Sequence, residues 1–159
     1  MKLVARRLVV LTALSLLIGC ASGRGNELLG SRISRLVDRM TESKESESQA
    51  LKELESLESQ AVPYLVGHLD DLRPLAERKI ILANKAPGIF EGARYYTPDT
   101  VHDALAAILN QITGQNFVFV YNGATLLERN ENRRKWVEWC RSAYPIQAGI
   151  CGGSAEKFH

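Results

Sequence analysis

The sequence predicts a mainly α-helical fold of about four to six helices, with one or two short extended segments. Apolar residues recur at three- and four-residue spacing over much of the chain, as they do on the buried face of a helix. Helix-start signals accompany this spacing, among them Thr125 followed by Glu128, which is a capping box. Continuous apolar runs of strand length occur at 79–83 and 117–121.

We expect the first helix over about residues 27–40. Its apolar residues share one helical face: Leu29, Ile33, Leu36, Val37 and Met40. Residues 41–48 are polar and charged without apolar spacing, which predicts a loop or a frayed helix end. Residues 49–69 predict two short helices that break near 59–61, with Pro63 in the first turn of the second.

The middle of the chain leaves two interpretations open. Residues 79–83 form either a strand or a buried helix end, and residues 117–121 form either a short strand or an extended segment that fills the core. If both are strands, they are candidates to pair with each other. Residues 94–96 are expected to be extended.

Two further helices carry the clearest end signals. The helix over about residues 98–113 has Thr97 as its N-cap, Pro98 in its first position and Gly114 as its C-cap. The last helix is expected over about residues 125–143, opened by the capping box named above.

Several stretches resemble the HEAT-like helical repeat proteins of bacteria: 60–65 (QAVPYL), 69–71 (LDD), 101–109 (VHDALAAIL), 112–117 (ITGQNF), and Trp136 with Trp139. The resemblance covers about residues 51–140 and implies helical pairs that stack to share one core. We therefore expect residues 28–143 to form a short HEAT-like array, followed by a Gly-rich tail over 144–159. The same resemblance implies a binding role without naming what is bound.

The N-terminus has the layout of a bacterial export signal. Lys2, Arg6 and Arg7 precede an apolar stretch over 8–18, which is shorter than the roughly 20 residues of a membrane-spanning helix. Residues 17–20 (LIGC) resemble the lipobox of bacterial lipoproteins.

The lipobox resemblance implies that residues 1–19 are removed, that Cys20 becomes the lipid-anchored first residue, and that residues 20–27 form a tether. No Asp follows Cys20 directly, and in a Gram-negative host this implies sorting to the outer membrane, facing the periplasm. The expected partners are the lipid bilayer, through the acyl groups on Cys20, and a protein of the cell envelope.

The charge balance gives no reason to expect a nucleic-acid partner. The signal holds three of the 20 basic residues and none of the 18 acidic ones, so 17 basic and 18 acidic residues remain, a formal charge of −1. Nucleic-acid-binding domains carry a basic excess instead.

Cysteine usage predicts one disulfide bond. With Cys20 assigned to the lipid, Cys140 and Cys151 remain as a pair in an oxidising compartment. The alternative is a buried Cys140 and a free Cys151. A bond would fasten the C-terminal tail to the last helix.

No catalytic or metal-binding constellation is visible, so we expect neither enzyme activity nor a cofactor. His68, His102 and His159 lack a ligand partner at metal-site spacing. Asp70 and Asp71 are adjacent carboxylates, which capping in a turn explains.

The last helix holds the candidate interaction surface: Trp136, Trp139, Arg133 and Arg134. The two tryptophans either form an aromatic platform for a ligand or pack in the core. The arginines belong to a basic cluster, for which two interpretations remain. The cluster binds lipid phosphate or an acidic partner, or it is simply a solvated helix face. This basic cluster comprises Arg129, Arg133, Arg134, Lys135 and Arg141.

These features predict a non-catalytic lipoprotein that acts as a protein-interaction or assembly-factor domain. One alternative is a pilotin-like protein that escorts a secretion or pilus component. Another is a cell-envelope enzyme or a peptidoglycan-binding protein, which requires a concave pocket with converging titratable groups.

Overall fold

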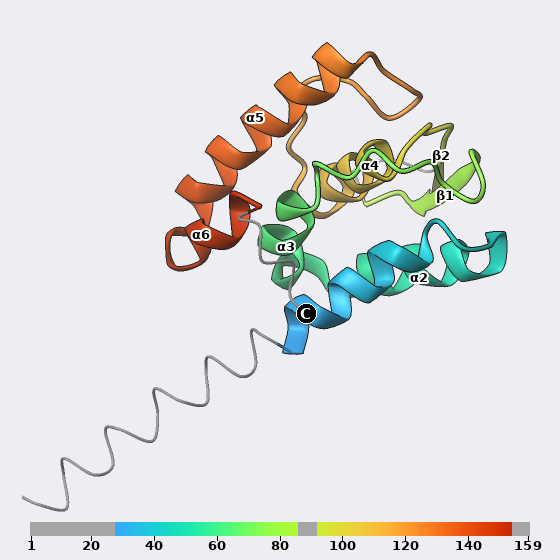
Figure 1. The fold of residues 1–159 in the computed structure, drawn as a ribbon, viewed down its shortest axis with the longest axis horizontal. Helices are drawn as coiled ribbons and strands as arrows, with labels where there is room; N and C mark the ends of the chain where they lie inside the picture. The colour runs from blue at the N-terminus through green and yellow to red at the C-terminus, as the bar shows by residue number, and fades with distance from the viewer. Residues whose placement is uncertain (1–27, 86–91, 154–159) are drawn as a thin grey trace, which may run out of the picture.

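A computed structural model gives the fold, and it describes residues 28–85 and 92–153 (Figure 1). The expected signal peptide, the Cys20 anchor, the tether and His159 lie outside the described residues. The described part is mainly helical with a small two-stranded antiparallel sheet, which confirms the predicted fold class.

The first two helices form one edge of the molecule. The first covers residues 28–39 of the described chain. The second, α2 (Lys44–Ser56), begins earlier than predicted, so residues 44–48 are helical and the expected loop is wrong. The Ser43 hydroxyl caps this start by accepting a main-chain N–H of the first turn at 3.2 Å. The apolar pattern missed this turn because its inward-facing residue is Glu47, a buried glutamate.

The chain then breaks where the sequence indicates. A short 3-10 helix, η1 (Glu58–Gln60), separates α2 from α3 (Val62–Gly67), and Pro63 lies in the first turn of α3 as predicted. Residues 62–66 are all buried, so α3 is a core helix despite its short length.

The sheet consists of β1 (Ile80–Ala83) and β2 (Ala93–Tyr96), paired antiparallel. The strand interpretation of residues 79–83 is thereby confirmed, as is the extended conformation of residues 94–96. In β1 buried and exposed residues alternate, because only one face of the sheet meets the helices.

The long central helix α4 (Val101–Thr113) keeps its predicted C-cap, since Gly114 adopts a φ of +70°. Its N-cap is Thr100, and the predicted cap at Thr97 is wrong. Asp103 decides this position, because its carboxylate accepts the N–H groups of Asp99 and Thr100 and closes a capping box.

The last long helix, α5 (Leu126–Ala143), begins at the predicted capping box of Thr125 and Glu128. Residues 117–121 lie in the loop before it and pair with neither strand, so their pairing with 79–83 is wrong. A side chain, and not a neighbouring strand, supplies a hydrogen-bond partner for the main chain of this loop. Asn132 Nδ2 donates to the Val118 carbonyl oxygen at 2.7 Å.

Part of the segment expected as a Gly-rich tail is folded. A 3-10 helix, η2 (Pro145–Gln147), leads into the short helix α6 (Ala148–Cys151), which packs on α3 and α5. The Sγ atoms of Cys140 and Cys151 lie 2.06 Å apart, a disulfide distance, so the bond predicted from the sequence is present. Gly67 permits this packing, because a Cβ there would lie 2.8 Å from the Ile150 carbonyl oxygen.

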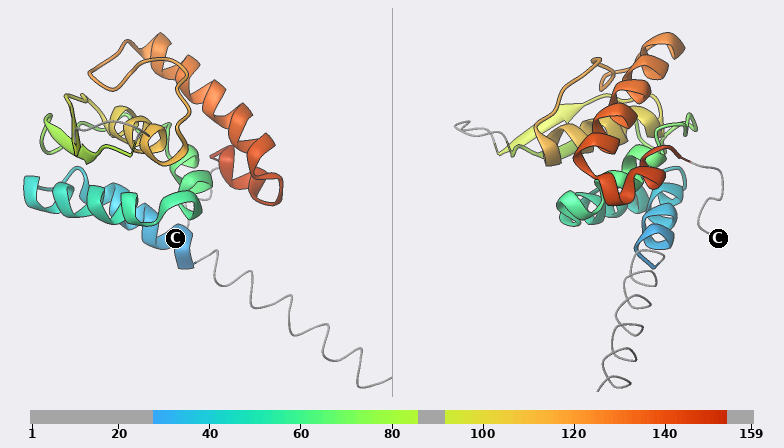
Figure 2. Two further views of the ribbon diagram at one scale, coloured as in Figure 1. Left: turned by 180° about the vertical axis from the view of Figure 1, so that it is seen from behind. Right: turned by 90° about the vertical axis from the view of Figure 1, so that its left-hand side faces the viewer.

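Helix α4 is the centre of the core. Residues 101–109 are all buried, and α4 contacts α2, α3 and β1. Figure 2 shows α5 and α6 at one end of the molecule and the sheet at the other, with the start of helix 28–39 nearer to the α6 end. Among the described residues, no helix combines the length and the apolar character needed to cross a membrane.

Candidate binding site beside strand β2

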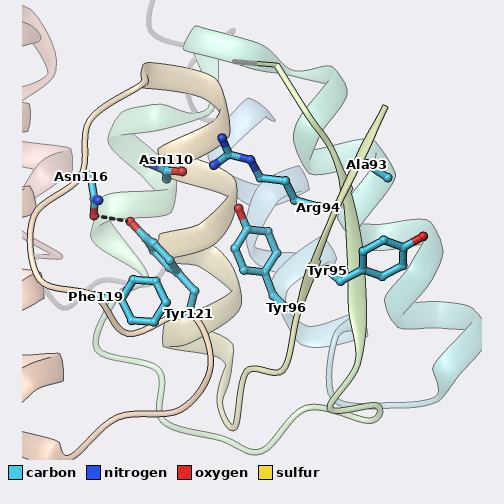
Figure 3. A pocket seen from close by; sticks show the side chains of 8 residues that line it. All are labelled: Ala93, Arg94, Tyr95, Tyr96, Asn110, Asn116, Phe119 and Tyr121. Atoms are coloured by element: carbon cyan, nitrogen blue, oxygen red, sulfur yellow. Dashed lines mark hydrogen bonds between the residues drawn. The ribbon is translucent and has the colours of Figure 1, made fainter. Parts of the chain in front are cut away.

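The candidate site is a hollow of about 350 Å³ at the sheet end of the molecule. It opens between β2, the last turn of α4 and the loop over 114–125 (Figure 3). Its lining residues come from these three elements: Ala93, Arg94, Tyr95, Tyr96, Asn110, Asn116, Phe119 and Tyr121. We call it the β2 hollow.

Strand alternation decides which residues of β2 reach into the hollow. Arg94 and Tyr96 point toward α4, while Tyr95 points away from it (Figure 3). Tyr96 is buried, and its hydroxyl accepts a hydrogen bond from Gln111 Nε2 at 2.8 Å. Tyr95 remains 67% exposed, beside Ile81 of β1, which is 56% exposed. The sheet therefore presents an apolar outer face next to the hollow.

Aromatic rings form the opposite wall. The Tyr121 ring meets the rings of Tyr96 and Phe119 edge to face, at centroid distances of 5.7 and 5.1 Å. The Tyr121 hydroxyl donates to Asn116 Oδ1 at 3.0 Å, and burial raises the pKa of this hydroxyl to about 12. It therefore stays protonated near neutral pH. Phe119 is 59% exposed and leaves the rim of the hollow apolar.

Arg94 is the charged group of the hollow. It forms no ion pair and no side-chain hydrogen bond with any described residue. Asn110 also lines the hollow, and its Nδ2 donates to the Gln115 carbonyl at 2.8 Å. Because no described carboxylate pairs with this cation beside the aromatic rings, the hollow favours an acidic ligand group.

One edge of β2 is free on the side of the hollow. The Ala83 N–H points away from β2, since it donates to Glu55 Oε1 at 3.2 Å, while the Asn84 N–H donates to the Gly92 carbonyl. In an antiparallel pair such bonds alternate, so the main-chain groups of Ala93 and Tyr95 point away from β1. Neither residue has a main-chain partner among the described residues.

The loop covers only the far end of this edge. The Thr97 N–H lies on the same side and donates to Asn122 Oδ1 at 2.9 Å. Within residues 28–85 and 92–153, the main-chain groups of Ala93 and Tyr95 thus stay open next to the hollow. An unpaired strand edge is a template for another extended chain.

The surface predicted on the last helix does not meet this hollow. Trp136 is fully buried, with its ring at 4.9 Å from the Phe117 ring and 5.5 Å from the Trp139 ring. Its proposed place on an interaction surface is therefore wrong, and the core-packing alternative holds for it. Trp139 is half-buried in the same cluster, while Arg133 and Arg134 line a separate hollow on α5.

The basic cluster is partly neutralised within the fold. Arg129 binds the fully buried Asp103 through two contacts of 2.7 Å, so it stabilises the start of α4. Arg134 pairs with Glu131 and Glu138.

The histidines make structural contacts. His68 Nε2 lies 3.1 Å from the Ser34 hydroxyl, and His102 Nδ1 lies 2.6 Å from the Leu69 carbonyl oxygen. Burial lowers the pKa of His102, so its ring is neutral near neutral pH. The described residues contain no group of three potential metal ligands.

Sequence reasoning did not single out the residues of the β2 hollow. Residues 117–121 stood out as an apolar run but were interpreted as strand or core, and Arg94 and Tyr96 as part of an extended segment. The one usable signal was an arginine followed directly by two tyrosines in a short extended segment.

Comparisons with protein-family models, with curated proteins and with solved structures found no match for this chain. The resemblance to HEAT-like repeats and to the lipobox thus stays a prediction from the sequence.

Proposed function

We propose that the chain is a non-catalytic lipoprotein, held at a membrane surface through Cys20, whose helical body binds a protein of the cell envelope. The lipobox over 17–20 supports the anchor, and in a Gram-negative host the residues after Cys20 favour the outer membrane facing the periplasm.

The observation that carries the binding role is the open edge of β2 beside the β2 hollow. An extended segment of a partner can add to this edge through the main-chain groups of Ala93 and Tyr95. Alternate side chains of that segment then enter the hollow, where aromatic rings accept an apolar side chain and Arg94 accepts an acidic one. The proposed partner is therefore a protein with an exposed, extended segment that carries both kinds of residue.

Photo-crosslinking in intact cell envelopes tests this proposal. A photoreactive residue replaces Tyr95 at the open edge, and a matched probe replaces Ile146, which is 98% exposed on η2 at the opposite end. The proposal predicts one main protein adduct from position 95, none of that mass from position 146, and a weaker adduct in Arg94→Gln. Adducts of equal yield from both positions, or recovery of muropeptides alone, would contradict it.

A further inference from the structure

A second hollow, of about 770 Å³, lies on α5 at the end opposite the sheet. Its lining residues belong to α5, apart from the glycine that follows α6: Asn130, Arg133, Arg134, Val137, Glu138, Arg141 and Gly152. Three of them are arginines, and their partners differ. Arg134 is bound to Glu131 at 2.8 Å and to Glu138 at 3.3 Å. Arg133 and Arg141 form no ion pair with a described carboxylate.

The two unpaired guanidinium groups converge on Gly152. Arg133 Nη2 donates to the Gly152 carbonyl oxygen at 3.3 Å. Arg141 also lies against this glycine, because a Cβ on Gly152 would lie 2.7 Å from its Nη2. The absence of a side chain at position 152 thus lets both cations reach one place. The disulfide between Cys140 and Cys151 fastens this glycine beside α5.

Arg133 also has an unsatisfied donor. Its Nε is buried and finds no acceptor among the residues that the structure describes. A buried donor without an acceptor costs free energy, so an anion that supplies an acceptor to this guanidinium would be stabilised here. Glu138 does not supply one, because Arg134 holds its carboxylate.

We propose that Arg133 and Arg141 bind a phosphate group. A phosphate presents several anionic oxygens in different directions, and so it can accept hydrogen bonds from two guanidinium groups at once. The group can come from free phosphate or from a phospholipid headgroup. Helix 28–39, which follows the expected tether, starts nearer to the α6 end than to the sheet. This site is separate from the β2 hollow and does not depend on the proposed function.

The test follows the arginine Nε–H signals of the full mature chain, kept in detergent, by nuclear magnetic resonance during titration with inorganic phosphate. We expect saturable shifts of the Arg133 and Arg141 signals. Arg141→Gln should weaken binding roughly tenfold or more, because one charge-assisted contact is lost. Arg134→Gln is the matched control, with the same helix and the same charge change, and it should alter binding by less than roughly twofold because this guanidinium is already paired. Arg141 is exposed and Gln tolerates its position, so the variant is expected to fold.

Nanodiscs in phosphate-free buffer distinguish the two sources. Shifts of the same signals in phosphatidylglycerol discs but not in phosphatidylcholine discs assign the site to an anionic lipid headgroup. Shifts only with inorganic phosphate assign it to free phosphate. The proposal is overturned if no signal shifts saturably in any arm, or if Arg134→Gln weakens binding as much as Arg141→Gln.

Discussion

Glu47 makes the stability of this fold depend on pH in a direction opposite to that of an ordinary carboxylate. The side chain is 1% exposed in the first turn of α2. Its Oε2 accepts the Glu77 N–H at 2.6 Å, while its Oε1 has no partner among the described residues. Burial raises the pKa of Glu47 from 4.5 to about 7, and the nearby charge of Glu77 adds to the rise.

The sign follows from proton binding. Between pH 4.5 and pH 7 the folded chain keeps the Glu47 proton that the unfolded chain has released, so stability falls as pH rises. The full contribution is present below pH 4.5 and is lost as pH rises through about 7. At about 1.4 kcal/mol per pH unit over this interval, the loss amounts to about 3 kcal/mol.

Glu47→Gln replaces the carboxyl by a neutral group of the same shape that keeps an acceptor for the Glu77 N–H. The measurement is urea unfolding of both proteins at pH 4.5 and pH 8. We expect similar stabilities at pH 4.5 and a variant that is more stable by about 3 kcal/mol at pH 8. Burial lowers the pKa of His102, which makes stability rise with pH. Because both proteins contain His102, this contribution cancels when the two are compared. A stability difference that does not change with pH would refute the reasoning.

Three further perturbations test the packing of the core. Cys151→Ser removes the disulfide bond, which joins residues 11 positions apart, and should lower the free energy of unfolding in urea by about 3 kcal/mol. An unchanged urea midpoint would show that the disulfide bond contributes nothing to stability. Trp136→Ala removes a fully buried side chain and should cost about 3–5 kcal/mol by the same assay, and more than Trp139→Ala; equal losses would contradict the assignment of Trp136 to the core. Asp103→Asn removes the buried carboxylate 2.7 Å from the Arg129 guanidinium and leaves that group only the longer contact with Asp99, at 3.8 Å. Thermal unfolding should therefore show a loss of about 3–5 kcal/mol in stability; a variant of unchanged stability would argue against a buried pair.

Helix ends with local signals could be predicted from the sequence. The start of α5 is set by the capping box of Thr125 and Glu128, and the end of α4 is set by Gly114. Both signals lie within a few residues of the helix end, and both ends were predicted correctly. The start of α4 could not be fixed in this way, because Thr97 and Thr100 are both good caps. The choice depends on Asp103, whose carboxylate is held in place by Arg129 from a distant helix.

The sheet and the site depend on contacts between distant parts of the chain. The apolar run at 117–121 looks more like a strand than the ARYY segment of β2, yet Asn132 of α5 holds the run as a loop. The hollow arises only where this loop passes the open edge of β2. Apolar periodicity describes one helix or strand at a time. It therefore predicts which elements form, but not which of them pack against each other.

The central claim is that a partner segment adds to the open edge of β2. Ala93→Pro tests it most directly, because proline removes the N–H that faces away from β1 and leaves the bonds between β1 and β2 intact. Ala93→Ser is the matched control and retains the N–H. The measurement is the yield of the partner adduct that crosslinks from position 95, in two variants of equal thermal stability. We expect this adduct to persist in Ala93→Ser and to disappear in Ala93→Pro. An adduct of undiminished yield in Ala93→Pro would contradict strand addition.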